Sequence, residues 1–141
     1  MQISKETIFE RFKAISQNTL ISHLGIEFVD VSDDFVVGRM LVTSKLHQPD
    51  GVLHGGATVA LAETIGSFAS LVLMDSDKMF VRGIEISANH IKSVREGYVY
   101  AKAVYLHKGR TTQLLEIRVT DEEDNLISLC KLTTIALPRK N

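Results

Sequence analysis

The sequence predicts an α+β domain in which a curved antiparallel sheet wraps around one long, apolar helix. Three observations predict this class: the order of the segments (a helix, two strands, a long helix, then four strands), the composition of residues 57–74, and the short turns between neighbouring strands. Residues 57–74 are almost entirely apolar, small or hydroxylated, so this helix needs cover on most faces. A curved antiparallel sheet supplies that cover. We therefore expect one domain over residues 1–141, with an open sheet edge that invites dimerisation.

The first part of the chain predicts one helix and a β-hairpin. Apolar residues recur at helical spacing in residues 7–15, and Ser4 stands where a helix cap is expected. Residues 19–24 predict a short helical turn or a loop. Residues 26–31 and 35–42 alternate in polarity, which indicates two strands joined by a turn at residues 32–34.

The remainder of the chain predicts the long helix followed by four strands. The helix over residues 57–74 follows a loop that contains Pro49 and Gly51. The β-rich segments are residues 80–94, 98–107, 111–120 and 126–137, with turns at residues 95–97, 108–109 and 121–125. The sequence contains neither an internal repeat nor an interdomain linker.

The composition narrows the class of protein. The chain has 141 residues, 45% of them apolar, and its formal net charge of −1 argues against a dedicated nucleic-acid binder. We expect no signal peptide, because no basic segment followed by an apolar one opens the chain. We also expect no membrane-spanning helix, because Glu63, Gly66 and four hydroxyl residues interrupt the apolar run over residues 57–74. Cys130 is the single cysteine, which excludes an internal disulfide. Its alternating segment has no local base, so we expect a buried, inert thiol and a reducing, cytoplasmic compartment.

Glu63 is the one carboxylate within the apolar helix. Burial of such a group costs several kcal/mol unless it is paired, solvated in a cleft or protonated. At about 100° per residue, it shares a small and polar stripe with Gly56, Gly66, Ser67 and Ser70. Two interpretations are open. The stripe packs against a second backbone, or it lines a cleft where Glu63 meets a substrate and Ser67 orients it or an attacking water. Packing needs no carboxylate, which favours the cleft.

Residues 48–56 lead into the N-terminus of this helix, where backbone N–H groups are unpaired and the helix dipole is positive. Gly55 and Gly56 leave those donors uncovered, as an oxyanion hole requires, and one such donor is worth about 3 kcal/mol in acyl transfer. His54 is a candidate second donor or loop anchor, and Gln48 is a candidate to position a water or the carbonyl. Each signal alone is also typical of an ordinary turn.

Residues 54–63, with Gln48 and Gly51 before them, resemble the active-site signature of the hot-dog-fold acyl-CoA thioesterases. Within this family the chain is similar to the phenylacetate-pathway and 4-hydroxybenzoyl-CoA branch, and most of all to the 1,4-dihydroxy-2-naphthoyl-CoA hydrolases of menaquinone synthesis. The similarity covers about residues 23–137 and includes residues 83–90 and 95–97. It implies a hot-dog fold that hydrolyses an acyl- or aroyl-CoA to the free acid and coenzyme A.

The resemblance also implies roles for individual residues. Glu63 acts as nucleophile or as general base on water, the Gly55 N–H polarises the thioester carbonyl, and Ser67 helps to place the nucleophile or water. Gln48 and His54 lie close to the reacting group. The residues implied to meet coenzyme A from the facing subunit are Gly83, His90, Ile91, Lys92 and Ser93. Those implied to hold its nucleotide and phosphate end are His107, Lys108, Gly109, Arg110, Thr111 and Thr112. Lys108 and Arg110 suit phosphate on physical grounds, although an ordinary solvated turn has the same composition.

One residue departs from the family pattern. Asp50 stands where the naphthoyl-CoA hydrolases usually have an apolar residue, and a carboxylate beside the acyl pocket would change the preferred acyl group. We expect a dimer with two composite sites, paired again into a tetramer, with no nucleic-acid or membrane partner. We also expect no metal or redox cofactor, because the histidines lack metal-ligand spacing. Two rivals stay open: a hot-dog dehydratase of 3-hydroxyacyl thioesters, and a non-catalytic acyl-CoA-binding module.

Overall fold

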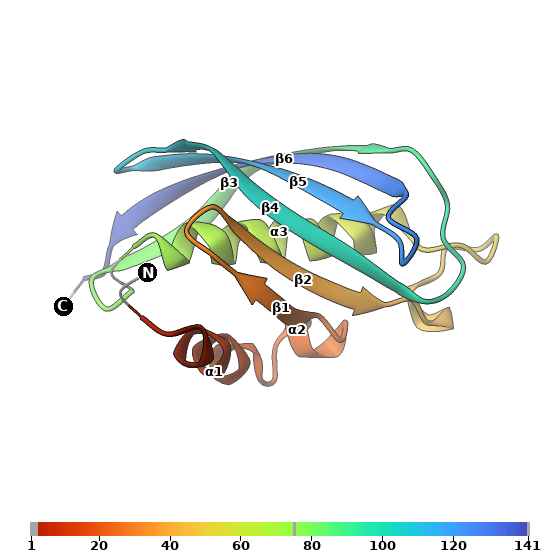
Figure 1. Ribbon diagram of the computed structural model, residues 1–141, viewed down its shortest axis with the longest axis horizontal. Coiled ribbons are helices and arrows are strands. Elements are labelled where there is room, and N and C mark those ends of the chain that lie inside the picture. The colour runs from red at the N-terminus through yellow and green to blue at the C-terminus, as the bar shows by residue number, and fades with distance from the viewer. Residues whose placement is uncertain (1–2, 75, 141) are drawn as a thin grey trace.

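A six-stranded antiparallel sheet curves around one long helix, α3 (Gly55–Val72), in the computed structural model, which describes residues 3–74 and 76–140 (Figure 1). The strand order is β1-β2-β4-β5-β6-β3. The strands are β1 (Glu27–Val31), β2 (Phe35–Leu41), β3 (Met79–His90), β4 (Tyr98–Lys108), β5 (Thr112–Thr120) and β6 (Leu126–Pro138). The other helices are α1 (Lys5–Ser16), α2 (Leu20–His23) and the 3-10 turn η1 (Ser44–Leu46). The predicted α+β class and its hot-dog arrangement are confirmed.

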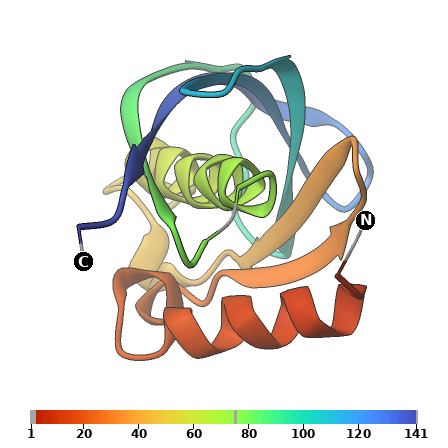
Figure 2. The ribbon, with the colours of Figure 1, turned by 90° about the vertical axis from the view of Figure 1, so that its left-hand side faces the viewer.

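The core lies between α3 and the concave face of the sheet. Leu61, Ile65 and Ala69 of α3 are fully buried against strand residues such as Leu115 and Leu132. In length and composition α3 also resembles a membrane-spanning helix, but core helices of globular folds pass the same test, and here α3 occupies the middle of the curved sheet (Figure 2).

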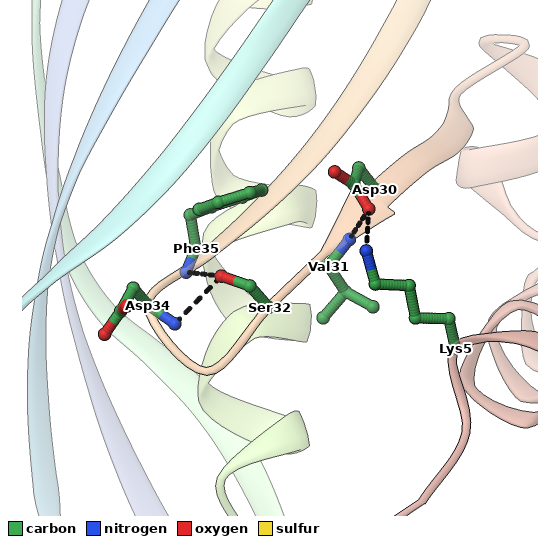
Figure 3. Close-up of polar contacts among 6 residues, drawn as sticks. All are labelled: Lys5, Asp30, Val31, Ser32, Asp34 and Phe35. Atoms are coloured by element: carbon green, nitrogen blue, oxygen red, sulfur yellow. Dashed lines mark hydrogen bonds and ion pairs between the residues drawn. The ribbon is translucent and has the colours of Figure 1, made fainter. Parts of the chain in front are cut away.

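Helix α1 crosses below α3 and covers the end of the sheet at β1 (Figure 2). Ser4 caps it as predicted, because its hydroxyl accepts a hydrogen bond from the Thr7 N–H. Phe12 packs edge-on against Phe68 of α3, with ring centroids 4.6 Å apart. The Lys5 ammonium donates to the Asp30 carboxylate of β1 at 2.8 Å and ties the start of α1 to the sheet (Figure 3).

The predicted turn at residues 32–34 joins β1 to β2. Its geometry is set by the Ser32 hydroxyl, which accepts hydrogen bonds from the N–H groups of Asp34 and Phe35 (Figure 3). This local side-chain to backbone bonding is the reason that serine and aspartate favour turns.

A buried chain of hydrogen bonds connects α3 to the turn between β4 and β5. The Ser70 hydroxyl pairs with the Thr134 hydroxyl at 2.8 Å, Thr134 donates to the Gln113 side-chain oxygen at 2.9 Å, and the Gln113 amide donates to the Gly109 carbonyl at 2.7 Å. The three side chains are fully buried. Because buried polar groups are costly when unpaired, this chain fixes the helix and the turn relative to each other.

The bounds predicted for one strand and for the long helix differ from the structure by two residues or more. The strand predicted over residues 80–94 ends at His90, because the N–H groups of Ile91 and Lys92 both turn to the Ile127 carbonyl and the chain leaves the ladder. The helix predicted over residues 57–74 begins at Gly55 and ends at Val72, because His54 acts as its cap. The earlier start places both glycines inside the first helical turn.

Candidate active site

Glu63 lies at the middle of α3, half-buried, and lines a cavity of about 460 Å³. The cavity lies between α3, the α1–α2 region and the start of β3. The backbone of Gly83 in β3 approaches the carboxylate so closely that a Cβ there would lie 2.8 Å from Glu63 Oε1. The carboxylate therefore has one wall of bare backbone and one side open to the cavity, as the cleft interpretation expects.

The small and polar stripe of α3 divides into two parts. Ser67 lines the same cavity as Glu63. Gly66 and Ser70 are buried against the sheet, Gly66 because a Cβ there would lie 2.6 Å from Leu132 Cδ2, and Ser70 through its bond to Thr134. The cleft interpretation holds for Glu63 and Ser67, the packing interpretation holds for Gly66 and Ser70, and Gly56 is exposed at the start of the helix.

The first turn of α3 presents one free backbone donor. The N–H of Gly56 donates to Nδ1 of His54 at 2.8 Å, and the N–H groups of Ala57 and Thr58 donate to the His54 carbonyl. The N–H of His54 itself donates to the Leu46 carbonyl. Among the described residues, only the Gly55 N–H of this turn has no acceptor. The free N–H at the positive end of α3 therefore belongs to Gly55, the residue to which the family resemblance assigns polarisation of the thioester carbonyl.

His90 stands over this donor. Its Nδ1 is hydrogen-bonded to the fully buried Ser128 hydroxyl, and its Nε2 would lie 2.8 Å from a Cβ placed on Gly55. Gly55 is therefore required by the close approach of the imidazole. Both residues line a second cavity of about 240 Å³ together with Gln48, Ile91, Lys92 and Ser93. The structure thus brings together six of the predicted residues at the N-terminus of α3, and His54 adjoins them as the cap.

Glu63 and Gly55 do not meet within one protomer. They are eight residues apart on α3, which corresponds to about 12 Å along the helix axis. Glu63 and Ser67 line one cavity, with Gly83 next to the carboxylate, and Gln48, Gly55 and residues 90–93 line the other. A carbonyl carbon has to lie near 3 Å from both nucleophile and oxyanion donor, which neither cavity alone allows.

The turn at residues 107–112 lies at the opposite end of the sheet from His90. His90 pairs with Ser128 and Ser128 with Val119, seven residues of β5 from Thr112, which amounts to about 24 Å. The Lys108 ammonium already donates to the Asp33 carbonyl at 2.8 Å and lies over the Tyr105 ring. Arg110 is exposed at the tip of the turn and is the better-placed cation for a phosphate.

Asp50 lines neither of the two cavities described above. Its carboxylate accepts a hydrogen bond from the Gln48 amide at 2.8 Å. Both residues belong to a tight turn in which the Gly51 N–H donates to the Gln48 carbonyl and Gly51 has a φ of +81°. Asp50 therefore orients the Gln48 side chain.

Sequence reasoning missed Ser128, which holds His90, and the α1–α2 wall of the Glu63 cavity. Ser128 is an inward-facing hydroxyl in an apolar strand, and that mismatch with the pattern of β6 was the available signal. The expectation for Cys130 agrees with the structure: the thiol is buried, and burial raises its pKa, which disfavours the nucleophilic thiolate.

Comparison with known proteins identifies the family. The thioesterase superfamily model matches residues 50–128. A relative from Pasteurella multocida, named as an esterase, is 43% identical over 129 residues, which cover 92% of this chain and 92% of the relative. A solved thioesterase from Pseudomonas aeruginosa, carrying a glutamine-to-alanine change, has a TM-score of 0.90 and 37% identity, covering 93% of this chain and 94% of that chain.

Two solved variants of one Staphylococcus aureus protein also match, each with a TM-score of 0.83, at 37% and 36% identity. They cover 85% and 84% of this chain and 99% and 98% of those chains. One replaces a glutamate by alanine, and the other replaces a glutamine fifteen positions earlier. Gln48 and Glu63 have the same separation here.

The chain belongs to the thioesterase superfamily, and its relatives support hydrolysis of a thioester as its general activity.

Proposed function

We propose that the protein hydrolyses an acyl- or aroyl-CoA thioester to the free acid and coenzyme A, with Glu63 as the catalytic carboxylate. The observation that carries this proposal is the pairing of one free backbone donor, the Gly55 N–H, with one open carboxylate on the same helix. The donor stabilises the oxyanion that forms when the carbonyl is attacked, and the carboxylate attacks or deprotonates water.

The two groups act from different copies of the chain. Since about 12 Å separates them along α3, Glu63 of one copy meets the Gly55 N–H, Gln48 and His54 of a second copy related by a two-fold axis. The open edge of β3, where Ile84 is exposed, is available for such a contact. The dimer then holds two equivalent composite sites, and a further pairing gives a tetramer.

In this proposal the contacts with coenzyme A are also divided between two copies of the chain. Residues 90–93 border the cavity at Gly55, and Arg110 lies at the far end of the sheet, so we assign them to one coenzyme A from different copies. In this proposal the turn at residues 107–112 of the copy that supplies Glu63 holds the nucleotide and phosphate end. The reaction needs no metal or redox cofactor, and we assign it to the cytoplasm and to the phenylacetate-pathway and 4-hydroxybenzoyl-CoA branch.

The test is release of free thiol from a panel of acyl-CoA substrates by wild type and the Glu63→Gln variant. Glutamine keeps the size of the side chain but neither attacks nor accepts a proton, so we expect kcat to fall at least about a hundredfold with an unchanged unfolding midpoint. Wild-type-like hydrolysis by this variant would refute the assignment. Dehydration of a 3-hydroxyacyl thioester without thiol release would favour the dehydratase, and binding without turnover would favour the non-catalytic module.

Subunit complementation tests the composite site directly. Glu63→Gln and Gln48→Ala copies are inactive separately, but a mixed dimer contains one site with both residues intact. Random co-assembly should therefore restore about a quarter of wild-type activity. If each site belonged to one copy, no mixed dimer would contain an intact site, and the mixture would stay inactive.

Arg110→Ala tests the nucleotide end. Loss of an exposed phosphate contact should raise KM for coenzyme A thioesters and leave kcat close to wild type. A selective fall in kcat would show that the nucleotide end is misplaced in this proposal.

A further inference from the structure

The cavity beside Glu63 has a wall that no step of the proposed reaction uses. This wall consists of the end of α1, the α1–α2 link and α2, and its residues are Phe12, Ile15, Leu20 and Ile21. All four are apolar, although they border the same cavity as the catalytic carboxylate. A pocket with an apolar lining and few polar groups is typical of a small-molecule site.

Two residues of this wall are exposed to an unusual degree for their type. Ile15 is 56% exposed and Leu20 is 64% exposed, so neither contributes much to the core. Single exposed apolar residues are ordinary, but these two face one cavity together with the apolar α3 residues Phe68 and Leu71. A contiguous exposed apolar lining of this kind marks a groove for an apolar ligand.

The open face of α3 connects the wall to the reacting centre. Ala60, Glu63, Thr64, Ser67 and Leu71 recur at spacings of three and four residues, so they lie on one side of the helix, and none of them is fully buried. The sheet does not cover this side. A group attached to a carbonyl at Glu63 therefore passes along α3 to the α1–α2 wall without crossing packed protein.

The charged residues at the rim of the cavity do not point to an anionic ligand. Arg139 donates through Nε to the carbonyls of Ser76 and Met79. Arg82 donates to its neighbour's carbonyl and stacks over the Phe80 ring at 4.3 Å. Both arginines line the cavity, and these contacts hold their side chains at its rim.

We propose, on the basis of the thioesterase function above, that this cavity binds the acyl part of the substrate as an uncharged apolar chain or ring. The α1–α2 wall, through Ile15 and Leu20, sets the upper limit on its size. The volume of about 460 Å³ lies within the range of pockets that enclose a small organic ligand, so the preferred acyl group is larger than acetyl.

The experiment measures kcat/KM by thiol release for acetyl-, hexanoyl-, decanoyl-, benzoyl- and adipyl-CoA. Ile15→Trp and Leu20→Trp reduce the cavity from its exposed wall, where a larger side chain does not disturb the core. The matched control is Leu41→Trp, because Leu41 is 43% exposed at the end of β2 and is not part of the cavity lining.

We expect wild type to prefer hexanoyl-, decanoyl- or benzoyl-CoA over acetyl-CoA, and hexanoyl- over adipyl-CoA, by about tenfold or more. Ile15→Trp and Leu20→Trp should lower kcat/KM for decanoyl- and benzoyl-CoA by about tenfold and change acetyl-CoA less than about twofold. The control should keep the wild-type profile, and light scattering should give all three variants the wild-type mass.

Three outcomes overturn the inference while leaving the thioesterase function intact. One is an unchanged acyl profile in both wall variants, another is a preference for adipyl-CoA, and the third is a changed mass that identifies the wall as a subunit interface. If wild type releases thiol from none of the substrates, the proposed function fails first and the inference fails with it.

Discussion

Gly83→Ala provides a sharp test of how the catalytic carboxylate is positioned. A Cβ at this residue would lie 2.8 Å from Glu63 Oε1 and 3.5 Å from Leu132 Cδ1. Ordinary contact begins near 3.4 Å, so the carboxylate has to move by about 0.6 Å, while Leu132 is undisturbed. Misplacement of a reacting group by about 1 Å costs about a hundredfold in rate, so this shift should lower kcat roughly tenfold.

The assay is steady-state thiol release combined with urea unfolding. The substitution should not lower stability, because Gly83 has an exposed position at the sheet edge and alanine restricts the unfolded chain more than glycine does. Ser87→Ala, in the same strand and also exposed, is the control and should behave as wild type. A raised KM with unchanged kcat would refute the reasoning, since Gly83 would then act through contact with coenzyme A and not by positioning Glu63.

Three further predictions follow from local contacts. Thr134→Val removes the hydroxyl that donates to the buried amide oxygen and should lower the free energy of unfolding by about 1–3 kcal/mol in urea titrations. Asp50→Ala should reduce kcat/KM by about threefold because Gln48 loses its partner, whereas Asp50→Asn, which still accepts that bond, should not. Hydrogen bonds from Lys5 and, to a smaller extent, from the Val31 N–H lower the pKa of Asp30 below 3.8. The stabilisation of the fold by this carboxylate is therefore present above that value and is lost as pH falls through the pKa of the folded state. Asp30→Asn should therefore lower the urea midpoint at neutral pH, and the difference should vanish in strong acid.

The fold class was predictable because one dominant feature, an apolar helix in a chain of hairpins, has few ways to be covered. The strand boundaries were harder to predict. Ile91 and Lys92 continue the apolar and polar pattern of β3, although their N–H groups donate to the Ile127 carbonyl outside the β3–β6 ladder. Periodicity reports which side a residue faces, but it does not report where the hydrogen-bonded ladder stops.

The residues of the candidate site were predictable from the sequence, but their separation into two cavities was not. The sequence indicates a donor at Gly55 and a carboxylate at Glu63, but it does not indicate which sides of α3 the sheet covers. Ser67 and Ser70 illustrate the difficulty, because they are one helical turn apart and chemically equal. Ser70 is bonded to β6 inside the core and Ser67 lines the cavity. Only the order of the strands, with β3 at the edge, decides between them.

The same strand order explains how the fold tolerates a carboxylate in its central helix. A fully covered Glu63 would need a cation or several donors to offset desolvation. Instead β3 ends the sheet next to Glu63, and Gly83 supplies no side chain at the point of closest approach. The carboxylate is therefore held firmly on one side and left open on the other, as a group that must act on a bound carbonyl requires. A β-branched residue at position 83 would close this space, so the position of the carboxylate depends on the glycine.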